Sequence, residues 1–186
     1  MSVSTPAQER TRRTILDAAV RILTRDLSAS LADVAAEAGV GRTTVHRYFP
    51  ERNDLIVAIA ADTRDKLTAA QARARLHEGP TLDALERLCV EFFDLAGQQM
   101  LLALDNPVFT TWSGWEDNPT ERELRATIDR GRDAGELDAE LDTRWIENLI
   151  WSFAYIAWIS VNDDTGMSRH LTLQNCLRTL RKALAP

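Results

Sequence analysis

Two short helical segments separated by a tight turn constrain this fold more than any other sequence feature. Residues 30–38 and 42–48 each show helical spacing of apolar side chains, and a Gly-Val-Gly turn at residues 39–41 separates them. Ser30 with Asp33 three residues later forms a capping-box pattern, and a glycine follows as at many helix ends. Because helices this short are marginal in isolation, they must pack on a third. The pattern predicts a helix-turn-helix in a three-helix bundle.

Helical periodicity extends through the rest of the chain, and its interruptions predict the boundaries between elements. A long helix is predicted over residues 54–76, followed by a Gly-Pro breaker at residues 79–80. Later helices are predicted over residues 82–104, 119–135, 142–161 and 168–184. The predicted fold class is all-α with about nine helices. The predicted domains are a helix-turn-helix domain at 1–52, a connecting helix at 53–78 and a ligand-binding and dimerisation domain at 79–186.

The second helix of the pair carries side chains suited to nucleic acid. Arginine, threonine and histidine donate to phosphate oxygens and base edges, and this helix contains Arg42, Thr43, Thr44, His46 and Arg47. The competing interpretation is a solvated helix face in an ordinary all-α protein. The helix-turn-helix layout alone does not decide between the two.

A longer motif separates these interpretations. Residues 31–55 read LADVAAEAGVGRTTVHRYFPERNDL, with Val-Ala at 34–35, Ala-Gly-Val at 38–40, Tyr-Phe-Pro at 48–50 and Asp-Leu at 54–55. With these parts, residues 10–56 resemble the DNA-binding domain of the TetR family of transcriptional regulators. The resemblance implies base and phosphate contacts by the second helix and by residues beside it. The DNA-binding residues it predicts are Ser30, Arg42, Thr43, Thr44, His46, Arg47, Tyr48 and Arg52.

Several of these positions keep a second interpretation. His46 is either a DNA contact or an exposed polar residue, and Tyr48 can both pack and contact the backbone. The basic arm of Arg10, Arg12 and Arg13 either touches DNA or forms a solvated start of the first helix. Gly41 departs from the family pattern, in which Ser is common.

The resemblance also implies a homodimer with an effector cavity in each C-terminal domain. Aromatic and apolar side chains near helix breaks predict an apolar or aromatic small-molecule effector. The predicted cavity residues are Phe92, Phe93, Met100, Phe109, Trp112, Trp115, Trp151, Tyr155 and Trp158. The alternative for each of them is an ordinary place in the packed core. The last two helices are expected to pair across a two-fold axis. The predicted interface residues are Ile146, Leu149, Phe153, Ile156, Leu173, Leu177 and Leu180.

These expectations combine into a ligand-responsive repressor. The free dimer would bind a palindromic operator in double-stranded DNA, and the effector would act through the connecting helix to release it. Two alternatives stay open: a helical small-molecule-binding or interaction protein without DNA binding, and a transcriptional activator of the same fold.

Charge and residue content restrict the function further. Residues 1–66 contain ten Lys and Arg against nine Asp and Glu, whereas residues 67–186 contain twelve against nineteen. The net charge of −6 therefore arises outside the predicted DNA-binding domain. The three histidines lie in separate segments, and the sequence shows no nucleophile elbow, phosphate-binding loop or zinc pattern, so neither an enzyme nor a cofactor or metal is expected. Cys89 and Cys176 are expected to be small buried apolar residues. With neither a signal peptide nor a membrane span recognised, a cytoplasmic location is expected.

Overall fold

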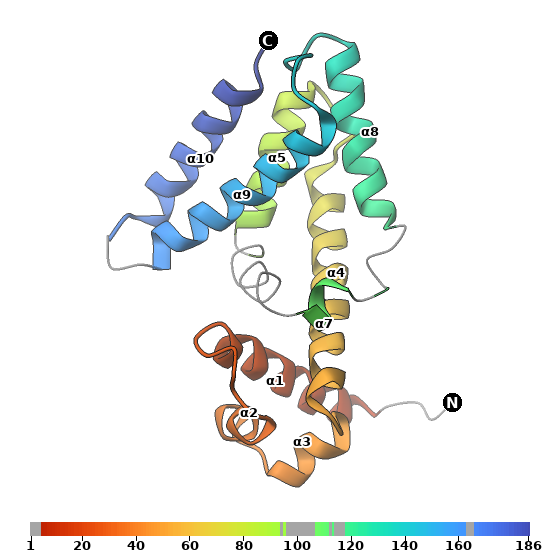
Figure 1. Ribbon diagram of the computed structural model, residues 1–186, viewed down its shortest axis with the longest axis vertical. Helices are drawn as coiled ribbons and strands as arrows, with labels where there is room; N and C mark the ends of the chain where they lie inside the picture. Colours follow the sequence, from red (N-terminus) through yellow and green to blue (C-terminus); the bar gives the residue numbers. More distant parts are fainter. Residues whose placement is uncertain (1–4, 94, 96–106, 112, 114–117, 163–165) are drawn as a thin grey trace. The chain divides into compact units, whose positions relative to one another are not determined.

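The computed structural model describes residues 5–93, 95, 107–111, 113, 118–162 and 166–186, which form helices, turns and loops with no strand among them (Figure 1). The predicted all-α class is confirmed. The chain divides into two compact units, the first comprising Met1–Thr63 with Leu101–Gly114 and the second Arg64–Met100 with Trp115–Pro186. Helix α4 (Arg52–Ala74) is continuous across the division, which falls within this helix and not at its ends.

The first unit is built on α1 (Pro6–Leu23), α2 (Leu31–Ala38), α3 (Arg42–Tyr48) and the first part of α4, and it also contains the short α7 (Pro107–Thr110). Helix α1 begins well before its apolar stripe, because Thr5 and Gln8 form a capping box around Pro6. The buried apolar side chains of these four helices, together with that of Phe49 directly after α3, include Ile15, Leu16, Leu23, Val34, Val45, Phe49, Leu55, Ile56 and Ile59. They form the core predicted for a helix-turn-helix bundle.

The turn between α2 and α3 has the geometry that its sequence predicts. Ser30 accepts a hydrogen bond from the Asp33 amide at 3.3 Å, and the Asp33 carboxylate accepts from the Ser30 amide at 2.8 Å. Gly39 ends α2 with φ +66°, a left-handed conformation that other residues adopt only with strain. Helix α3 then begins and ends at the predicted residues.

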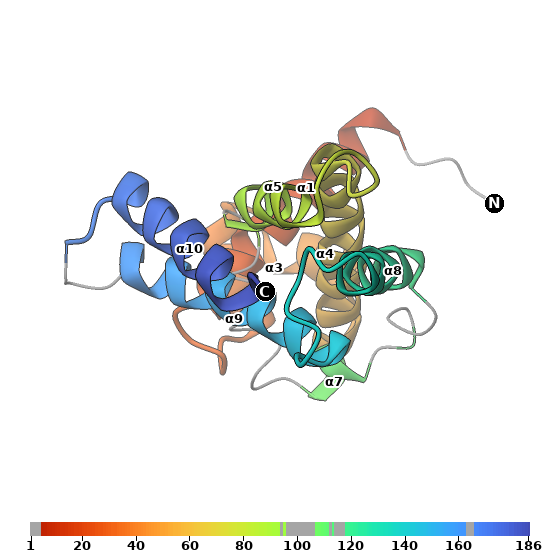
Figure 2. The ribbon, with the colours of Figure 1, turned by 90° about the horizontal axis from the view of Figure 1, so that it is seen from above.

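The second unit packs the remainder of α4 with α5 (Thr81–Phe93), α8 (Pro119–Asp133), α9 (Thr143–Asn162) and α10 (Arg169–Leu184). Helix α5 packs against α8, α9 and α10, and α9 also packs against α8 and α10 (Figure 2). The core of the unit takes side chains from all five helices, including Ala70, Leu76, Leu85, Leu88, Phe92, Ile128, Ile146, Ile150, Leu180 and Leu184.

Hydrogen bonds and ion pairs link these helices near their ends. Glu136 accepts a hydrogen bond from the Thr81 amide at 2.6 Å, and this bond lowers the pKa of the Glu136 carboxyl. Arg181 of α10 binds both Asp83 and Glu86 of α5, at 2.6 Å each. Most of the acidic excess of the chain lies in this unit, where part of it pairs with arginines between helices.

Cys89 of α5 and Cys176 of α10 are free thiols, the first buried and the second half-buried. A hydrogen bond between the two side chains, together with burial, raises the pKa of the Cys89 thiol. Within the described residues, each helix is too short or too polar to cross a bilayer.

Replacing Gly131 of α8 by alanine should destabilise the second unit, although alanine is the better helix former. A Cβ at this position would lie 2.6 Å from Cγ2 of Thr81, and such overpacking costs about 1–3 kcal/mol. Urea unfolding followed by circular dichroism measures the effect. Ala126→Gly, at an exposed position of the same helix, is the control and reports helix propensity alone, about 1 kcal/mol. A Gly131→Ala protein more stable than the wild type would contradict this close packing.

Candidate nucleic-acid interface and effector cavity

Helix α3 exposes nearly all of its side chains. Of its seven residues, Val45 is the one that is fully buried, at 0% exposure. Five of the predicted contact residues surround it: Arg42, Thr43, His46 and Arg47 are exposed, and Thr44 is half-buried. One apolar anchor thus fixes the helix while its polar side chains face outward.

The C-terminal half of α3 is ordered by its own side chains. The guanidinium of Arg47 lies 5.3 Å from the ring centre of Tyr48, a cation–π contact that positions both groups. Tyr48 is half-buried, so it packs and also keeps exposed surface. The Nδ1 atom of His46 lies 3.3 Å from the Pro50 carbonyl oxygen. This contact engages the Nδ1 atom of His46 within the chain.

Ser30 has a structural role at the start of α2. Its hydroxyl donates to Asp33 Oδ2 at 2.6 Å, and this bond, with that from the Ser30 amide, lowers the pKa of the Asp33 carboxyl. Ser30 itself stays exposed. The predicted capping role is therefore present, and the predicted phosphate contact would have to share this hydroxyl.

Arg52, for which a phosphate contact was predicted, also forms hydrogen bonds within the first unit. Its Nε donates to the Ala29 carbonyl at 3.3 Å and its Nη2 donates to the Leu27 carbonyl. The guanidinium thus ties the start of α4 to the loop between α1 and α2. Because these carbonyls come from residues 23 and 25 positions away, the spacing within the motif could not reveal them.

The three arginines of the basic arm, Arg10, Arg12 and Arg13, have different surroundings in α1. Arg13 binds Asp17 and, at 2.5 Å, Asp62 of α4. Arg12 lies 5.6 Å from the ring centre of Phe49, and Arg10 is exposed. Two of the three arginines therefore stabilise the first unit, which the charge pattern alone did not indicate.

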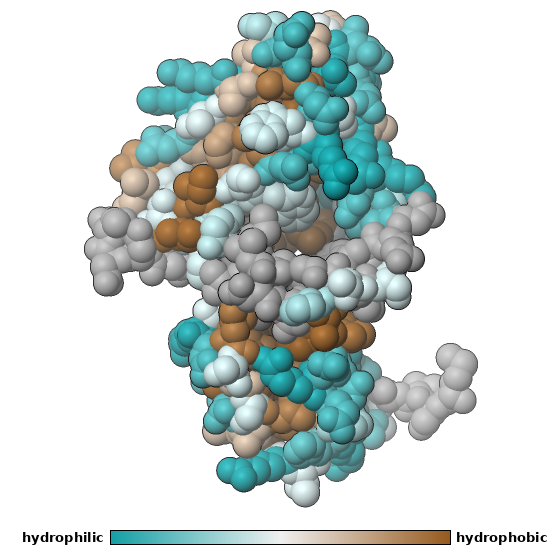
Figure 3. Space-filling model, viewed as in Figure 1, coloured by the Kyte–Doolittle hydropathy of each residue, from teal (hydrophilic) through white to brown (hydrophobic). Residues whose placement is uncertain are grey.

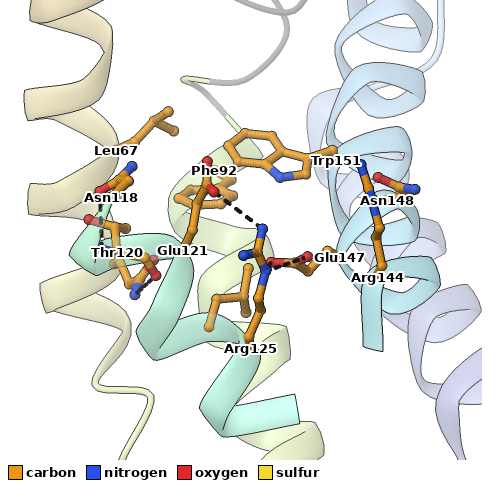
Figure 4. Close-up of a pocket in the computed structure, with 12 residues that line it drawn as sticks. Leu67, Phe92, Asn118, Thr120, Glu121, Arg125, Arg144, Glu147, Asn148 and Trp151 are labelled. Atoms are coloured by element: carbon orange, nitrogen blue, oxygen red, sulfur yellow. Dashed lines mark hydrogen bonds and ion pairs between the residues drawn. The ribbon is translucent and has the colours of Figure 1, made fainter. Parts of the chain in front are cut away.

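A cavity of about 220 Å³ lies among α4, α5, α8 and α9 in the second unit (Figure 4). Phe92 and Trp151, both predicted cavity residues, contribute to its wall and stack with ring centres 4.9 Å apart and planes 19° apart. The rest of the wall adds Leu67 and Leu124 and, beyond the apolar side chains that were predicted, eight polar or charged ones. These lining residues are Gln71, Asn118, Thr120, Glu121, Arg125, Arg144, Glu147 and Asn148.

Ion pairs cross this cavity. Arg125 Nε donates to both carboxylate oxygens of Glu147, at 2.9 and 3.0 Å, and its Nη2 donates to Glu121 at 3.3 Å. The bond to Glu147 and the charge of that group raise the pKa of Arg125. On the opposite side, the buried Gln71 amide donates to the Thr120 carbonyl at 2.8 Å. Sequence reasoning missed these residues, since nothing local marks a glutamate as buried.

The other predicted cavity residues that the structure describes do not line this cavity. Phe93 is buried, with the Arg169 guanidinium 5.0 Å from its ring centre. Tyr155 and Trp158 are half-buried further along α9, one and two turns past Trp151, and do not line this cavity. Met100, Trp112 and Trp115 lie outside the described residues, as does the side chain of Phe109.

Comparison with known proteins identifies the family. Residues 15–59, the helix-turn-helix and the start of α4, match bacterial regulatory proteins of the tetR family. The HTH-type transcriptional repressor LfrR of Mycolicibacterium smegmatis is 34% identical over 191 residues, spanning 98% of this chain and 95% of the relative. This chain belongs to the TetR family.

Solved TetR-family structures extend the likeness to the whole chain. LfrR, a TetR-like regulator from Mycobacterium smegmatis, matches with 32% identity and a TM-score of 0.68, over 94% of this chain and 99% of that one. LfrR in complex with proflavine matches with 31% identity and a TM-score of 0.70, over 95% and 98%. The ketosteroid regulator KstR2 of Mycobacterium tuberculosis, at 15% identity and a TM-score of 0.72 over 100% of this chain and 97% of that one, shares the fold alone.

Only some of the predicted dimer-interface residues have solvent-exposed surface in the single chain. Ile156 is 56% exposed, while Leu149, Phe153, Leu173 and Leu177 are half-buried. A groove of about 330 Å³ between α9 and α10 includes Phe153, Ile156 and Ala157 in its wall. Apolar side chains gather on the surface over α9 (Figure 3).

Two of the predicted interface residues are corrected by their burial. Ile146 and Leu180 have no exposed surface within the single chain, because they pack into the core of the second unit. Ile159, Met167 and Leu171 are exposed apolar residues that the sequence analysis did not name. Ile159 lies three positions after Ile156, so the two share one face of α9.

Replacing Gly41 by serine should stabilise the first unit. Gly41 is the N-cap of α3, with φ −69° and ψ 148°, and an added Cβ would meet nothing closer than 3.8 Å. Serine caps better than glycine and restricts the unfolded chain, so a gain of about 0.5–1 kcal/mol is expected. Thermal unfolding measures it. Gly39→Ser is the control and should destabilise, because φ is +66° there; the reverse ranking would contradict the turn geometry.

Proposed function

We propose that this protein is a transcriptional repressor that binds a palindromic operator as a homodimer and is released by a small-molecule effector. Two observations support the proposal. The family model matches the helix-turn-helix region, and α3 buries Val45 while its polar side chains point outward. LfrR, with 34% identity across nearly the whole chain, is itself a transcriptional repressor.

Helix α3 is the proposed recognition helix. Its opening residues Arg42, Thr43 and Thr44 are suited to base edges in the major groove, while Arg47 and Tyr48 are suited to the backbone. The basic surface of one subunit is small, since the first 66 residues carry only one more positive than negative side chain. Two subunits with their α3 helices one DNA turn apart, about 34–36 Å, would supply enough contacts.

Arg47→Ala should weaken operator binding by at least about tenfold, because it removes a charged contact and the partner of Tyr48. A gel shift with DNA from upstream of the gene, at fixed salt, measures the loss. Arg122→Ala, at an exposed position of α8, is the matched control and should bind as the wild type does. Equal binding by both variants would contradict the assignment of α3.

The α9–α10 face is the proposed dimer interface. It combines the exposed Ile156 and Ile159 with the groove beside them, an apolar surface that a second copy would cover. Both helices lie in the second unit, whereas α3 belongs to the first.

Ile156→Asp should convert the dimer to a monomer, because a carboxylate would be buried without a partner. Sedimentation equilibrium measures the change in mass. Val90→Asp, which also replaces an exposed apolar residue but on α5, is the control and should stay dimeric. A dimeric Ile156→Asp protein would place the interface elsewhere.

The cavity of the second unit is the proposed effector site. It holds the stacked Phe92 and Trp151, and LfrR has been solved with the aromatic dye proflavine, so an aromatic effector is proposed here too. Leu67 and Gln71 of α4 form part of the cavity wall, and the same helix begins in the first unit. An effector that binds one state of α4 more tightly than the other would shift operator affinity.

A further inference from the structure

The cavity contains a carboxylate whose counter-ion comes from the protein. Glu147 is buried, with 8% of its side chain exposed, and both of its oxygens accept hydrogen bonds from the single Nε of Arg125. The Arg125 side chain is 51% exposed. The negative charge is therefore fixed in the wall, while the positive charge that neutralises it reaches in from the solvent side.

An aromatic surface lies beside this charge. Trp151 is one helical turn after Glu147 on α9, so both side chains project toward the same cavity (Figure 4). Phe92 stacks against Trp151 and holds the indole in place, while Trp151 is only half-buried. An aromatic ring and a buried carboxylate one turn apart form a recognition pair for a flat cation.

We propose that the cavity binds a planar aromatic cation that stacks on Trp151 and pairs with Glu147 in place of Arg125. Arg125 is then a built-in competitor, which closes the site electrostatically until the ligand arrives. This inference rests on the proposed effector function and specifies the ligand class and the residues that select it.

The asymmetry of burial makes the exchange favourable. A displaced Arg125 remains hydrated, because half of its side chain is exposed, and it keeps Glu121 within reach at 3.3 Å. Glu147 cannot hydrate in the same way, so its carboxylate is stabilised by a cationic partner both with and without the ligand. The ligand supplies that cation and adds aromatic contact area, which Arg125 does not provide.

An anionic ligand fits the same wall less well. Arg125 and Arg144 carry positive charge, but both are exposed and accessible to water, whereas the buried charge is the Glu147 carboxylate. An anion entering between the rings and this carboxylate would meet a like charge in a poorly hydrated place. The charge buried most deeply therefore favours a cation.

Opposite effects of the two partners test the proposal. Titration of the purified full-length protein with proflavine, followed by quenching of tryptophan fluorescence, gives the dissociation constant of each variant. Glu147→Gln should weaken binding by about tenfold or more, because a charged hydrogen bond is lost. Arg125→Gln should tighten binding severalfold, because the competitor is gone. A merely structural ion pair predicts weaker binding for both variants.

Arg144→Gln is the matched control, since it removes the same charge from the same cavity without breaking the Glu147 pair. It should tighten proflavine binding less than Arg125→Gln does. If both arginine variants tightened proflavine binding equally, the change in net charge alone would explain the result. That outcome would overturn the competitor role of Arg125. The anionic dye 1-anilinonaphthalene-8-sulfonate should not compete with proflavine; competition that is lost in Arg125→Gln would overturn the cation assignment.

Folding and DNA binding are followed separately on every variant. Thermal unfolding by circular dichroism excludes loss of structure as the cause of weaker binding, and the Arg125→Gln result does not depend on it, because unfolding cannot tighten binding. A gel shift without dye reports operator binding alone. If operator binding is absent while the dye constants follow the expected order, the repressor function fails and the cation site stands. If operator binding is present and the dye constants do not change, the repressor function stands and the cation site fails.

Discussion

The burial of one valine holds the exposed surface of α3 in place. Helix α3 has seven residues and no side-chain cap at its start, so it has little stability of its own. Val45 packs into the first unit at 0% exposure, and Phe49 is buried directly after the helix ends. These two anchors enforce a helix that local propensity would not maintain. Since they occupy the inner face, the remaining side chains are left for contact with a partner.

Arginines do two different jobs in this chain. In α3 they are exposed to solvent. By contrast, Arg13 pairs with two carboxylates, and Arg52 donates hydrogen bonds to two loop carbonyls. In the second unit Arg181 links α10 to α5, and Arg125 enters the cavity to neutralise Glu147. Net charge therefore describes this protein poorly, because what an arginine does depends on whether a fixed acceptor lies within its reach.

Local sequence was sufficient to predict much of the fold. The bounds of α3, the cap at Ser30 and the end of α2 at Gly39 all agree with the prediction, because each depends on residues within four positions. The all-helical class followed from periodicity, and the start of α8 at Pro119 followed from capping chemistry. Of the site, the exposure of Arg42, His46 and Arg47 was also predictable, since it follows from helix periodicity.

The sequence by itself determined the helices, the turn and the family, because capping, periodicity and glycine geometry act over a single turn of chain. Only the tertiary structure decided which polar residues face inward: Arg52 toward the carbonyls of another loop, and Glu147 into a cavity shared by four helices. It also decided that Ile146 and Leu180 belong to the core while Ile156 stays on the surface. A side chain's partner across the fold is set by the packing of distant helices, and that packing leaves no mark on neighbouring positions.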